Sequence, residues 1–261
     1  GGYASVSPII AAWLRRKPIV LIEQNAVPGV ANRILSPFAS KIALGMPLKK
    51  NFFRKKKIID SGLPLRPEFD SGFNRENSFW QGPLKILVFG GSQGATAIND
   101  IVVRTLPLLH SLRAELKFVH QTGDRDIDWV SRAYEKENMD SDVKSFLFDI
   151  VDKYRWAHFV IARSGAVTIA EITAMGLPAL LVPFPESTHS HQEENAKFLS
   201  DKGAGILVRQ EDFEPEVLFS ILSKFVDDRK ALQEMSIKAE EFNDSCSRFS
   251  VAKICKEVVV Y

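Results

Sequence analysis

Short apolar runs alternate with segments of helical periodicity along this chain. From residue 84 onward, the apolar runs predict strands near 84–89, 116–121, 143–147, 158–162, 179–182 and 205–208. Apolar residues three to four positions apart predict helices over 95–109, 127–137, 149–157, 166–175 and 192–202, with further helices from about Pro215. Because strands and helices alternate strictly, the pattern predicts an α/β fold: a doubly wound parallel sheet with helices on both faces.

The N-terminal part repeats this pattern on a smaller scale. Its predicted elements are a helix from Ser7-Pro8 to about Arg16, a buried strand at 18–22, a helix at 28–38 and short strands at 42–44 and 57–60. Pro, Gly and polar residues then mark a linker. The expected division is a first domain at 1–67, a linker at 68–83, a second domain at 84–240 and a C-terminal helix at 241–261 that packs back on the first domain.

The chain opens on Gly1-Gly2-Tyr3-Ala4-Ser5, a turn of the kind that follows a strand. No strand precedes it in this sequence, so the first domain is expected to be incomplete. Ile19 to Ile22 would then lack a neighbouring strand on at least one edge.

Composition narrows the class of protein. Apolar residues make up 45% and charged residues 25%, as in a globular protein with a substantial core. The net charge is only +2, which gives no reason to expect nucleic-acid binding. No apolar run approaches the ~18 residues of a membrane-spanning helix. Cys246 and Cys255 fall in one predicted helical segment at a spacing that does not favour pairing, so a reducing cytoplasm is expected.

The segment Arg163-Ser164-Gly165-Ala166-Val167-Thr168-Ile169-Ala170-Glu171 carries the strongest chemical signal. A strand leads into a small-residue turn, and the helix that starts there presents unpaired N–H groups that favour an anion. Glu171 can accept hydrogen bonds from a vicinal diol such as a ribose. Phosphate beside ribose indicates a nucleotide. The alternative is an ordinary helix with Ser164 as its N-cap and Glu171 on a solvated face.

A second Gly-rich turn, Gly90-Gly91-Ser92-Gln93-Gly94-Ala95, follows the first strand of the second domain. It could approach a phosphate, or it could serve only helix–sheet packing. The G-x-G-x-x-G spacing of dinucleotide sites is not met, and the second strand ends in His120-Gln121-Thr122-Gly123 without an acid for an NAD ribose.

Two further segments leave alternatives open. In the polar loop 183–195, His191 and Gln192 could bind sugar hydroxyls, whereas His189 and His191 could start a metal site that lacks an obvious third ligand. The run Lys49 to Lys57 interleaves Phe52 and Phe53 with basic residues. It could rest on an anionic membrane surface or be a solvated loop.

Taken together, these segments resemble one family in the same order and with similar spacing over essentially the whole chain. The family is that of the bacterial glycosyltransferases that add N-acetylglucosamine to lipid-linked muramyl-pentapeptide, making lipid II for peptidoglycan. The matching segments are Gly1 to Ser5, Glu23-Gln24-Asn25-Ala26-Val27-Pro28-Gly29, Gly90 to Ala95, Arg163 to Glu171 and His191-Gln192.

The resemblance implies the GT-B architecture, two Rossmann-like domains facing across a cleft, with the UDP-sugar in the C-terminal one. It implies an inverting transfer in which the acceptor hydroxyl attacks the anomeric carbon and UDP leaves, with no metal or other cofactor. It also implies peripheral attachment to the inner face of the cell membrane. The donor-binding residues implied are Asn25, Arg66, Ser92, Leu147, Ala166, Val167, Thr168, Ile169, Ala170, Glu171 and Gln192. Those implied at the acceptor diphosphate are Gly1, Gly2, Tyr3 and Ser5.

The sequence also departs from the family pattern. The family's N-terminal Gly-rich loop, with a His proposed as general base, is not in this sequence, so no catalytic residue is assigned here. Ile22 stands where the family usually has His, and Leu63 where it usually has Asn. The alternatives are therefore a catalytically incomplete UDP-sugar binding module, or another GT-B enzyme such as a nucleotide-sugar epimerase or a natural-product glycosyltransferase.

Overall fold

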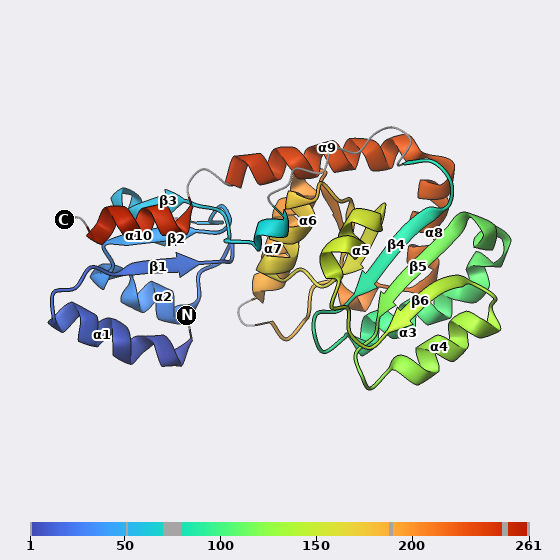
Figure 1. Cartoon of the computed structure of the whole chain (residues 1–261), viewed down its shortest axis with the longest axis horizontal. Coiled ribbons are helices and arrows are strands. Elements are labelled where there is room, and N and C mark those ends of the chain that lie inside the picture. Colours follow the sequence, from blue (N-terminus) through green and yellow to red (C-terminus); the bar gives the residue numbers. More distant parts are fainter. Residues whose placement is uncertain (1, 51, 70–79, 188–189, 247–249, 260–261) are drawn as a thin grey trace.

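The computed structural model describes residues 2–50, 52–69, 80–187, 190–246 and 250–259, which form two α/β units side by side (Figure 1). Within these residues the first unit has a three-stranded parallel sheet in the order β1-β2-β3. Its strands are β1 (Val20–Glu23), β2 (Lys41–Leu44) and β3 (Ile58–Asp60). Its helices are α1 (Val6–Leu14), α2 (Val30–Leu35) and α10 (Val251–Val259), with short 3-10 turns at Tyr3–Ser5, Ser36–Phe38, Lys55–Lys57 and Pro67–Phe69.

The first unit is built on the apolar run that ends in β1. Leu21 packs with Leu35 of α2, Ile42 of β2 and Phe53 in a small buried core. In the described chain β1 pairs with β2 alone and so forms an edge of the sheet, which leaves Ile22 partly exposed. The helix predicted to start at Ser7-Pro8 starts instead at Val6, after a 3-10 turn.

The second unit is a doubly wound sheet of six parallel strands among the described residues, in the order β6-β5-β4-β7-β8-β9. These are β4 (Leu84–Phe89), β5 (Leu116–Gln121), β6 (Asp140–Lys144), β7 (Phe159–Ala162), β8 (Ala179–Leu181) and β9 (Gly205–Leu207). The strand order reverses between β4 and β7, and in such a sheet ligands bind beyond the carboxyl ends of the strands at that point.

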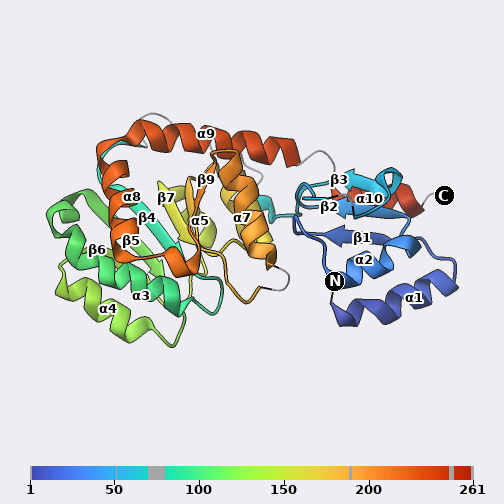
Figure 2. The ribbon, with the colours of Figure 1, turned by 180° about the vertical axis from the view of Figure 1, so that it is seen from behind.

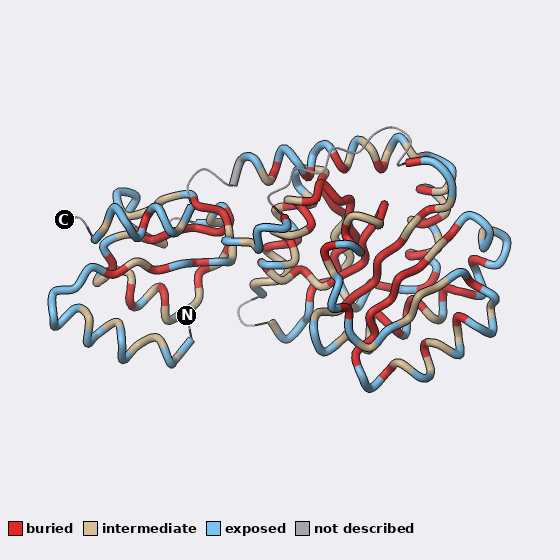
Figure 3. Tube along the Cα trace, viewed as in Figure 1, coloured by how far each residue is buried: buried red, intermediate tan, exposed pale blue. Residues whose placement is uncertain are grey.

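Helices cover both faces of this second sheet. They are α3 (Thr96–Thr105), α4 (Ile127–Lys136), α5 (Ile150–Trp156), α6 (Ala166–Ala174), α7 (His191–Asp201), α8 (Pro215–Asp227) and α9 (Arg229–Cys246), with 3-10 segments at Leu106–Glu115 and Gln210–Asp212. Along β4, Leu87 and Phe89 enter one core while Ile86 and Val88 enter the other. Burial on both faces explains the continuous apolar runs, and apart from Lys85 the residues of the central strands β4 and β7 are buried (Figure 3).

Two strands are displaced from their predictions: β1 covers Val20–Glu23 where 18–22 was expected, and β6 is shifted further. The run 143–147 was expected to be a strand, but β6 ends at Lys144 and Phe146-Leu147-Phe148 follows it as a loop. β6 is an edge strand whose residues are exposed or partly exposed and, apart from Val143, polar; Lys117 of β5 pairs with Asp140 across the ladder at 2.7 Å. A cross-strand ion pair, rather than an alternation of apolar residues, therefore supports the register of β6 against β5.

The end of the chain returns to the first unit. α9 packs on α6 and α8, and α10 lies against β1 and β2, so α1 and α10 belong to the same unit (Figure 2). The boundary expected between residues 240 and 241 falls inside α9, which is one continuous helix. Most of the expected linker, residues 70–79, lies outside the described part of the chain. The four domain ranges stay a prediction.

Candidate functional site

The two turns singled out in the sequence meet at the switch point of the second sheet. Phe89, the last residue of β4, is in register with Ala162 at the end of β7, so the Gly90 turn and the Arg163 turn start side by side. Gly91 and Gly94 have φ of +92° and +73°, a conformation that glycine adopts without strain. Gly94 lies directly against the carbonyl of Thr122, and a side chain there would collide with it. Close backbone packing thus accounts for part of this turn, and Ser92 is exposed on it.

Gln121 connects this turn to the loop after β6, a role that the sequence analysis did not assign. The side chain is buried at the end of β5. Its amide nitrogen donates to the Gly91 carbonyl at 2.7 Å, and its Oε1 accepts from the Leu147 N–H at 3.3 Å. The resemblance implies that the Leu147 backbone meets the uracil of the donor. Its N–H is engaged by Gln121, and Leu147 presents its carbonyl oxygen as the remaining backbone group.

The start of α6 has the form of an anion site. The helix begins at Ala166 with Gly165 as N-cap, and no side chain caps its first turn. Ser164 is fully buried and donates its hydroxyl to the Gln192 carbonyl at 2.8 Å, so the alternative in which Ser164 is the N-cap is wrong. The N–H groups of Ala166, Val167 and Thr168 occupy the first turn, where the helix dipole favours a negative group.

The remaining residues of this segment differ in exposure. Ile169 is 1% exposed, packs in the core and donates its N–H to the Gly165 carbonyl, so it offers no group to a ligand. Ala170 is partly exposed, and Glu171 is half-buried one turn further along.

The Glu171 carboxylate is held in place by a neighbouring tyrosine. Its Oε2 accepts a hydrogen bond from the hydroxyl of Tyr154 on α5 at 3.0 Å. Burial raises the pKa of the Glu171 carboxyl above its usual range, while the Tyr154 hydrogen bond and the charge of Arg66 lower it in part. Arg66, expected to approach the nucleotide from the linker, is exposed near this carboxylate and stacks on Phe69.

Arg163 has a structural role. It donates to the carbonyls of Val182 and Pro183 at 3.1 and 3.0 Å and to the side chain of Gln210 at 2.6 Å. Burial lowers the pKa of Arg163 to about 10, so the side chain stays cationic at neutral pH. It fixes the loops after β8 and β9 rather than facing the anion site.

Asn195, on the first turns of α7, joins the two units. Its side chain is fully buried and contacts the loop after β1 twice: Oδ1 accepts from the Ala26 N–H at 3.0 Å, and Nδ2 donates to Asn25 Oδ1 at 3.0 Å. Nδ2 also lies 3.4 Å from the Ser164 carbonyl. Asn195 thus brings Asn25 beside the turn that carries the anion site. No local pattern predicts this contact, since the partners lie 169 and 170 residues away along the chain.

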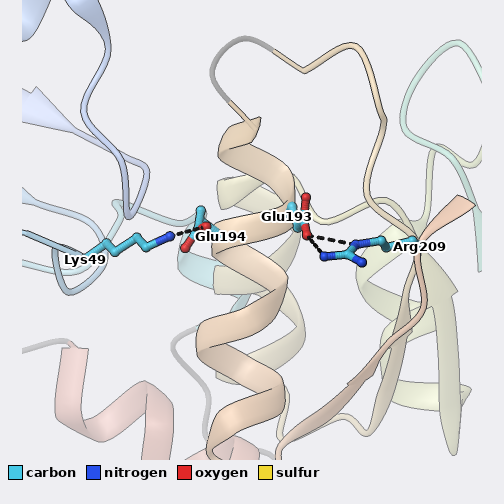
Figure 4. Close-up of polar contacts among 4 residues, drawn as sticks. All are labelled: Lys49, Glu193, Glu194 and Arg209. Atoms are coloured by element: carbon cyan, nitrogen blue, oxygen red, sulfur yellow. Dashed lines mark hydrogen bonds and ion pairs between the residues drawn. The ribbon is translucent and has the colours of Figure 1, made fainter.

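Adjacent glutamates on α7 point in opposite directions (Figure 4). Glu194 forms an ion pair with Lys49 of the first unit, whereas Glu193 pairs with Arg209 of its own unit at 2.7 Å. Gln192, one residue earlier, accepts from the Phe184 N–H at 3.0 Å through its side-chain oxygen. Its amide nitrogen remains as the group that could donate to a sugar.

A cavity of about 1200 Å³ opens along the outer edge of β1. Its walls include Gly2, Ser5, Asn25 and His191, so part of the expected acceptor segment lies close to the expected sugar site. Glu23 shapes the wall between them, because its carboxylate accepts from the N–H groups of Asn25 and Gly29 and from Asn32 Nδ2 at 2.8–3.1 Å. Gly1 and the side chain of Tyr3 lie outside the described residues.

Of the two histidines in the metal alternative, His189 lies outside the described residues and His191 starts α7. Elsewhere in the described chain, no group of three His, Cys, Asp or Glu side chains is placed to hold a metal ion. Over the same residues, no helix is both long and apolar enough to cross a membrane.

Comparison with known proteins places this arrangement in a family. The C-terminal domain model of glycosyltransferase family 28 matches residues 85–249, and its N-terminal domain model matches residues 1–44. The chain is 33% identical, over 99% of its own length and 72% of the relative's, to a UDP-N-acetylglucosamine--N-acetylmuramyl-(pentapeptide) pyrophosphoryl-undecaprenol N-acetylglucosamine transferase of Thermodesulfovibrio yellowstonii.

Solved structures agree with this placement. MurG of Acinetobacter baumannii superposes with a TM-score of 0.83 at 31% identity, over the whole of this chain and 72% of the other. A UDP-GlcNAc 2-epimerase from Neisseria meningitidis, bound to UDP-GlcNAc, covers 98% of this chain and 72% of its own with a TM-score of 0.62, but at 14% identity it shows the fold alone. The expected GT-B architecture is thereby confirmed, and the chain belongs to glycosyltransferase family 28, in the group of these N-acetylglucosamine transferases.

Proposed function

We propose that this chain is an inverting hexosyltransferase that moves N-acetylglucosamine from UDP-N-acetylglucosamine to lipid-linked N-acetylmuramyl-pentapeptide, the step from lipid I to lipid II in peptidoglycan synthesis. The observation that carries the proposal is the meeting of three features at one place. These are the uncapped start of α6, the Glu171 carboxylate, and the pair Asn25 and Gln192 that Asn195 brings together across the two units.

The donor would lie across these features in order. The diphosphate would accept hydrogen bonds from the N–H groups of Ala166 to Thr168, with Ser92 on the opposite turn. The ribose hydroxyls would donate to Glu171, and the uracil would reach the backbone at Leu147. The N-acetylglucosamine would then lie between Gln192 and Asn25.

The sugar transfer would depend on how the site stabilises the negative charge of the leaving diphosphate. The acceptor hydroxyl attacks the anomeric carbon from the side of the β1 cavity, the bond to the diphosphate breaks, and its electron pair leaves with UDP. The start of α6 stabilises the negative charge that grows on the leaving diphosphate. The acceptor diphosphate would lie near Gly1, Gly2, Tyr3 and Ser5. No residue of this sequence is proposed as the general base.

The test combines turnover with binding. The chain is incubated with UDP-N-acetylglucosamine and a lipid-linked acceptor, and UDP release is measured beside calorimetric titration with the donor alone. Release of UDP only when both substrates are present supports the transferase. Donor binding without release supports the incomplete binding module, and release without acceptor points to another donor chemistry.

A membrane surface is the natural location of a lipid-linked acceptor, and we propose peripheral attachment at the inner face of the cell membrane. In the run Lys49 to Lys57, Phe53 is buried in the core of the first unit and Phe52 lies under the guanidinium of Arg33. The run therefore offers charge but no apolar side chain for insertion into a membrane. The C-terminal end of α1 offers both charge and exposed apolar side chains. Ile10, Trp13 and Leu14 are 41–69% exposed, and exposed Arg15, Arg16 and Lys17 follow.

Vesicle binding separates these two surfaces. Trp13→Ala with Leu14→Ala should weaken binding to anionic vesicles at all salt concentrations, because insertion of apolar side chains is not screened. Replacing Lys55, Lys56 and Lys57 by Gln should weaken binding at low salt only, by about 1 kcal/mol for each charge that lies near the surface. Unchanged binding in both variants would contradict membrane attachment through the first unit.

A further inference from the structure

Tyr154 is a fully buried tyrosine whose single polar atom faces the candidate donor site. Its ring lies edge-on to Phe69 at 5.9 Å and to Phe89 at 5.8 Å, between centroids. Phe89 is the last residue of β4, immediately before the Gly90 turn, and Phe69 ends the 3-10 turn Pro67–Phe69. Rings on two separate elements therefore fix the position of the phenol.

The hydroxyl of Tyr154 has one described partner, the Oε2 atom of Glu171 at 3.0 Å. This bond joins α5 to α6 and ties down one oxygen of the carboxylate. The other oxygen, Oε1, accepts no hydrogen bond from the described residues. A glutamate side chain on a helix surface otherwise loses considerable rotamer entropy when it is fixed by a ligand. Here the hydrogen bond from Tyr154 already restricts the Glu171 side chain, so less rotamer entropy is lost when a ligand binds.

The bond also favours the charged form of Glu171. A hydroxyl that donates to a carboxylate stabilises its ionised state, and burial opposes it. Two groups face this carboxylate: Tyr154 from α5, and Arg66, which directly precedes the 3-10 turn Pro67–Phe69. Burial raises the pKa of Glu171, and both of these groups lower it. An ionised carboxylate accepts hydrogen bonds at both oxygens, whereas protonation turns one oxygen into a donor and reduces the capacity to accept from the two ribose hydroxyls.

We infer that Tyr154 is the positioning residue that orients the Glu171 carboxylate toward the vicinal hydroxyls of the donor ribose. The inference rests on the proposed function, because it assumes that a nucleoside diphosphate occupies the site. Tyr154 itself does not touch the ligand. It holds Oε2 so that Oε1 and the outer lone pairs of the carboxylate face the ribose.

The experiment compares UDP with 2′,3′-dideoxy-UDP, which lacks the hydroxyls that Glu171 would bind. Calorimetry on the full chain measures both affinities in the wild type, in Tyr154→Phe and in Tyr134→Phe. Tyr134 is the matched control, since it is also fully buried in the second unit but its hydroxyl meets His120 in the other core.

Tyr154→Phe should weaken UDP binding about 3- to 10-fold and leave dideoxy-UDP binding unchanged, as expected for loss of one hydrogen bond to a charged group. Tyr134→Phe should change neither affinity. Unchanged UDP affinity in Tyr154→Phe would overturn the inference, as would an equal loss for both nucleotides, which would indicate a general packing effect.

A double-mutant cycle tests the route of the effect. In a Glu171→Gln background, Tyr154→Phe should cost no further UDP affinity, because the carboxylate on which it acts is gone. An additional loss of the same size would overturn the inference. Thermal unfolding of each variant identifies any that fails to fold.

Failure of the proposed function would be visible separately, as a wild-type chain that binds no UDP. In that case carbon-13 NMR titration of the Glu171 carboxyl still tests whether the Tyr154 hydroxyl holds this carboxylate. The Glu171 resonance is assigned by its absence in Glu171→Gln. Its pKa should rise in Tyr154→Phe, and an unchanged pKa would overturn the inference.

Discussion

Single side chains in this site take their properties from neighbours that are distant in the sequence. Glu171 is recognisable as a candidate ribose ligand from its place after a small-residue turn, but its pKa is raised by burial, an effect that Tyr154 and Arg66 partly offset. Gln121 and Asn195 were missed for the same reason. Each is an ordinary polar residue until the fold places a backbone group beside it.

The raised pKa of Glu171 predicts a pH dependence of donor binding. Above this pKa the carboxylate is ionised and can accept from the ribose, so UDP affinity should fall as the pH drops through it. Calorimetric titration with UDP over a pH series measures the effect. Glu171→Gln is the control, because it removes this group while the ionisation of the diphosphate remains. The two profiles should differ in the acidic range, and identical profiles would contradict a role for Glu171.

At the scale of elements, predictability follows burial. β4 and β5 have the predicted bounds because both faces of a central parallel strand demand apolar residues. β6 was displaced because an edge strand carries little such pattern, and the apolar loop after it was more conspicuous than the strand. The candidate turns were found because their glycines and small residues are needed at strand ends.

Two glycines of the Gly90 turn should respond differently to substitution. Gly94→Ala combines a positive φ with a collision against the Thr122 carbonyl and should lower the free energy of unfolding by about 2–4 kcal/mol. Gly91→Ala is the matched control, since its φ is also positive but open space surrounds it, and it should lose only about 1 kcal/mol. Urea unfolding measures both, and equal losses would show that the close contact is unimportant.

At the scale of the whole molecule, the site depends on how the two units meet. Met46 and Phe69 pack in the core of the second unit, α10 returns to the first sheet, and Asn195 and Glu194 reach across from α7. The position of Asn25 beside the start of α6 therefore depends on this contact.

The Lys49–Glu194 pair should support binding of the sugar rather than of the nucleotide. Glu194→Lys should weaken binding of UDP-N-acetylglucosamine about 2- to 5-fold, as expected for one partly exposed ion pair, and leave UDP binding unchanged. Lys49→Glu combined with Glu194→Lys should restore part of the loss, and added salt should reduce the difference. Calorimetry with both ligands measures these effects.

Glu193 provides the control, because its pair with Arg209 lies within one unit (Figure 4). Glu193→Lys should leave the ratio of the two affinities at its wild-type value. A matching loss in this variant would mean that any charge change on α7 disturbs the site, and would remove the special role of the contact between the units.

The alternation of strands and helices, the two candidate turns, Glu171 and the family resemblance are all readable from the order of residues, because period, turn chemistry and residue order are local properties. Only the folded chain shows that Ser164 bonds Gln192 instead of capping α6 and that Ile169 is a core residue. The same holds for the hydrogen bonds that join Tyr154 to Glu171, Gln121 to Leu147 and Asn195 to Asn25. These facts depend on which distant polar groups become neighbours once water is excluded. No local pattern encodes that pairing, whereas the segment from Arg163 to Glu171 carries its helix start in its own residues.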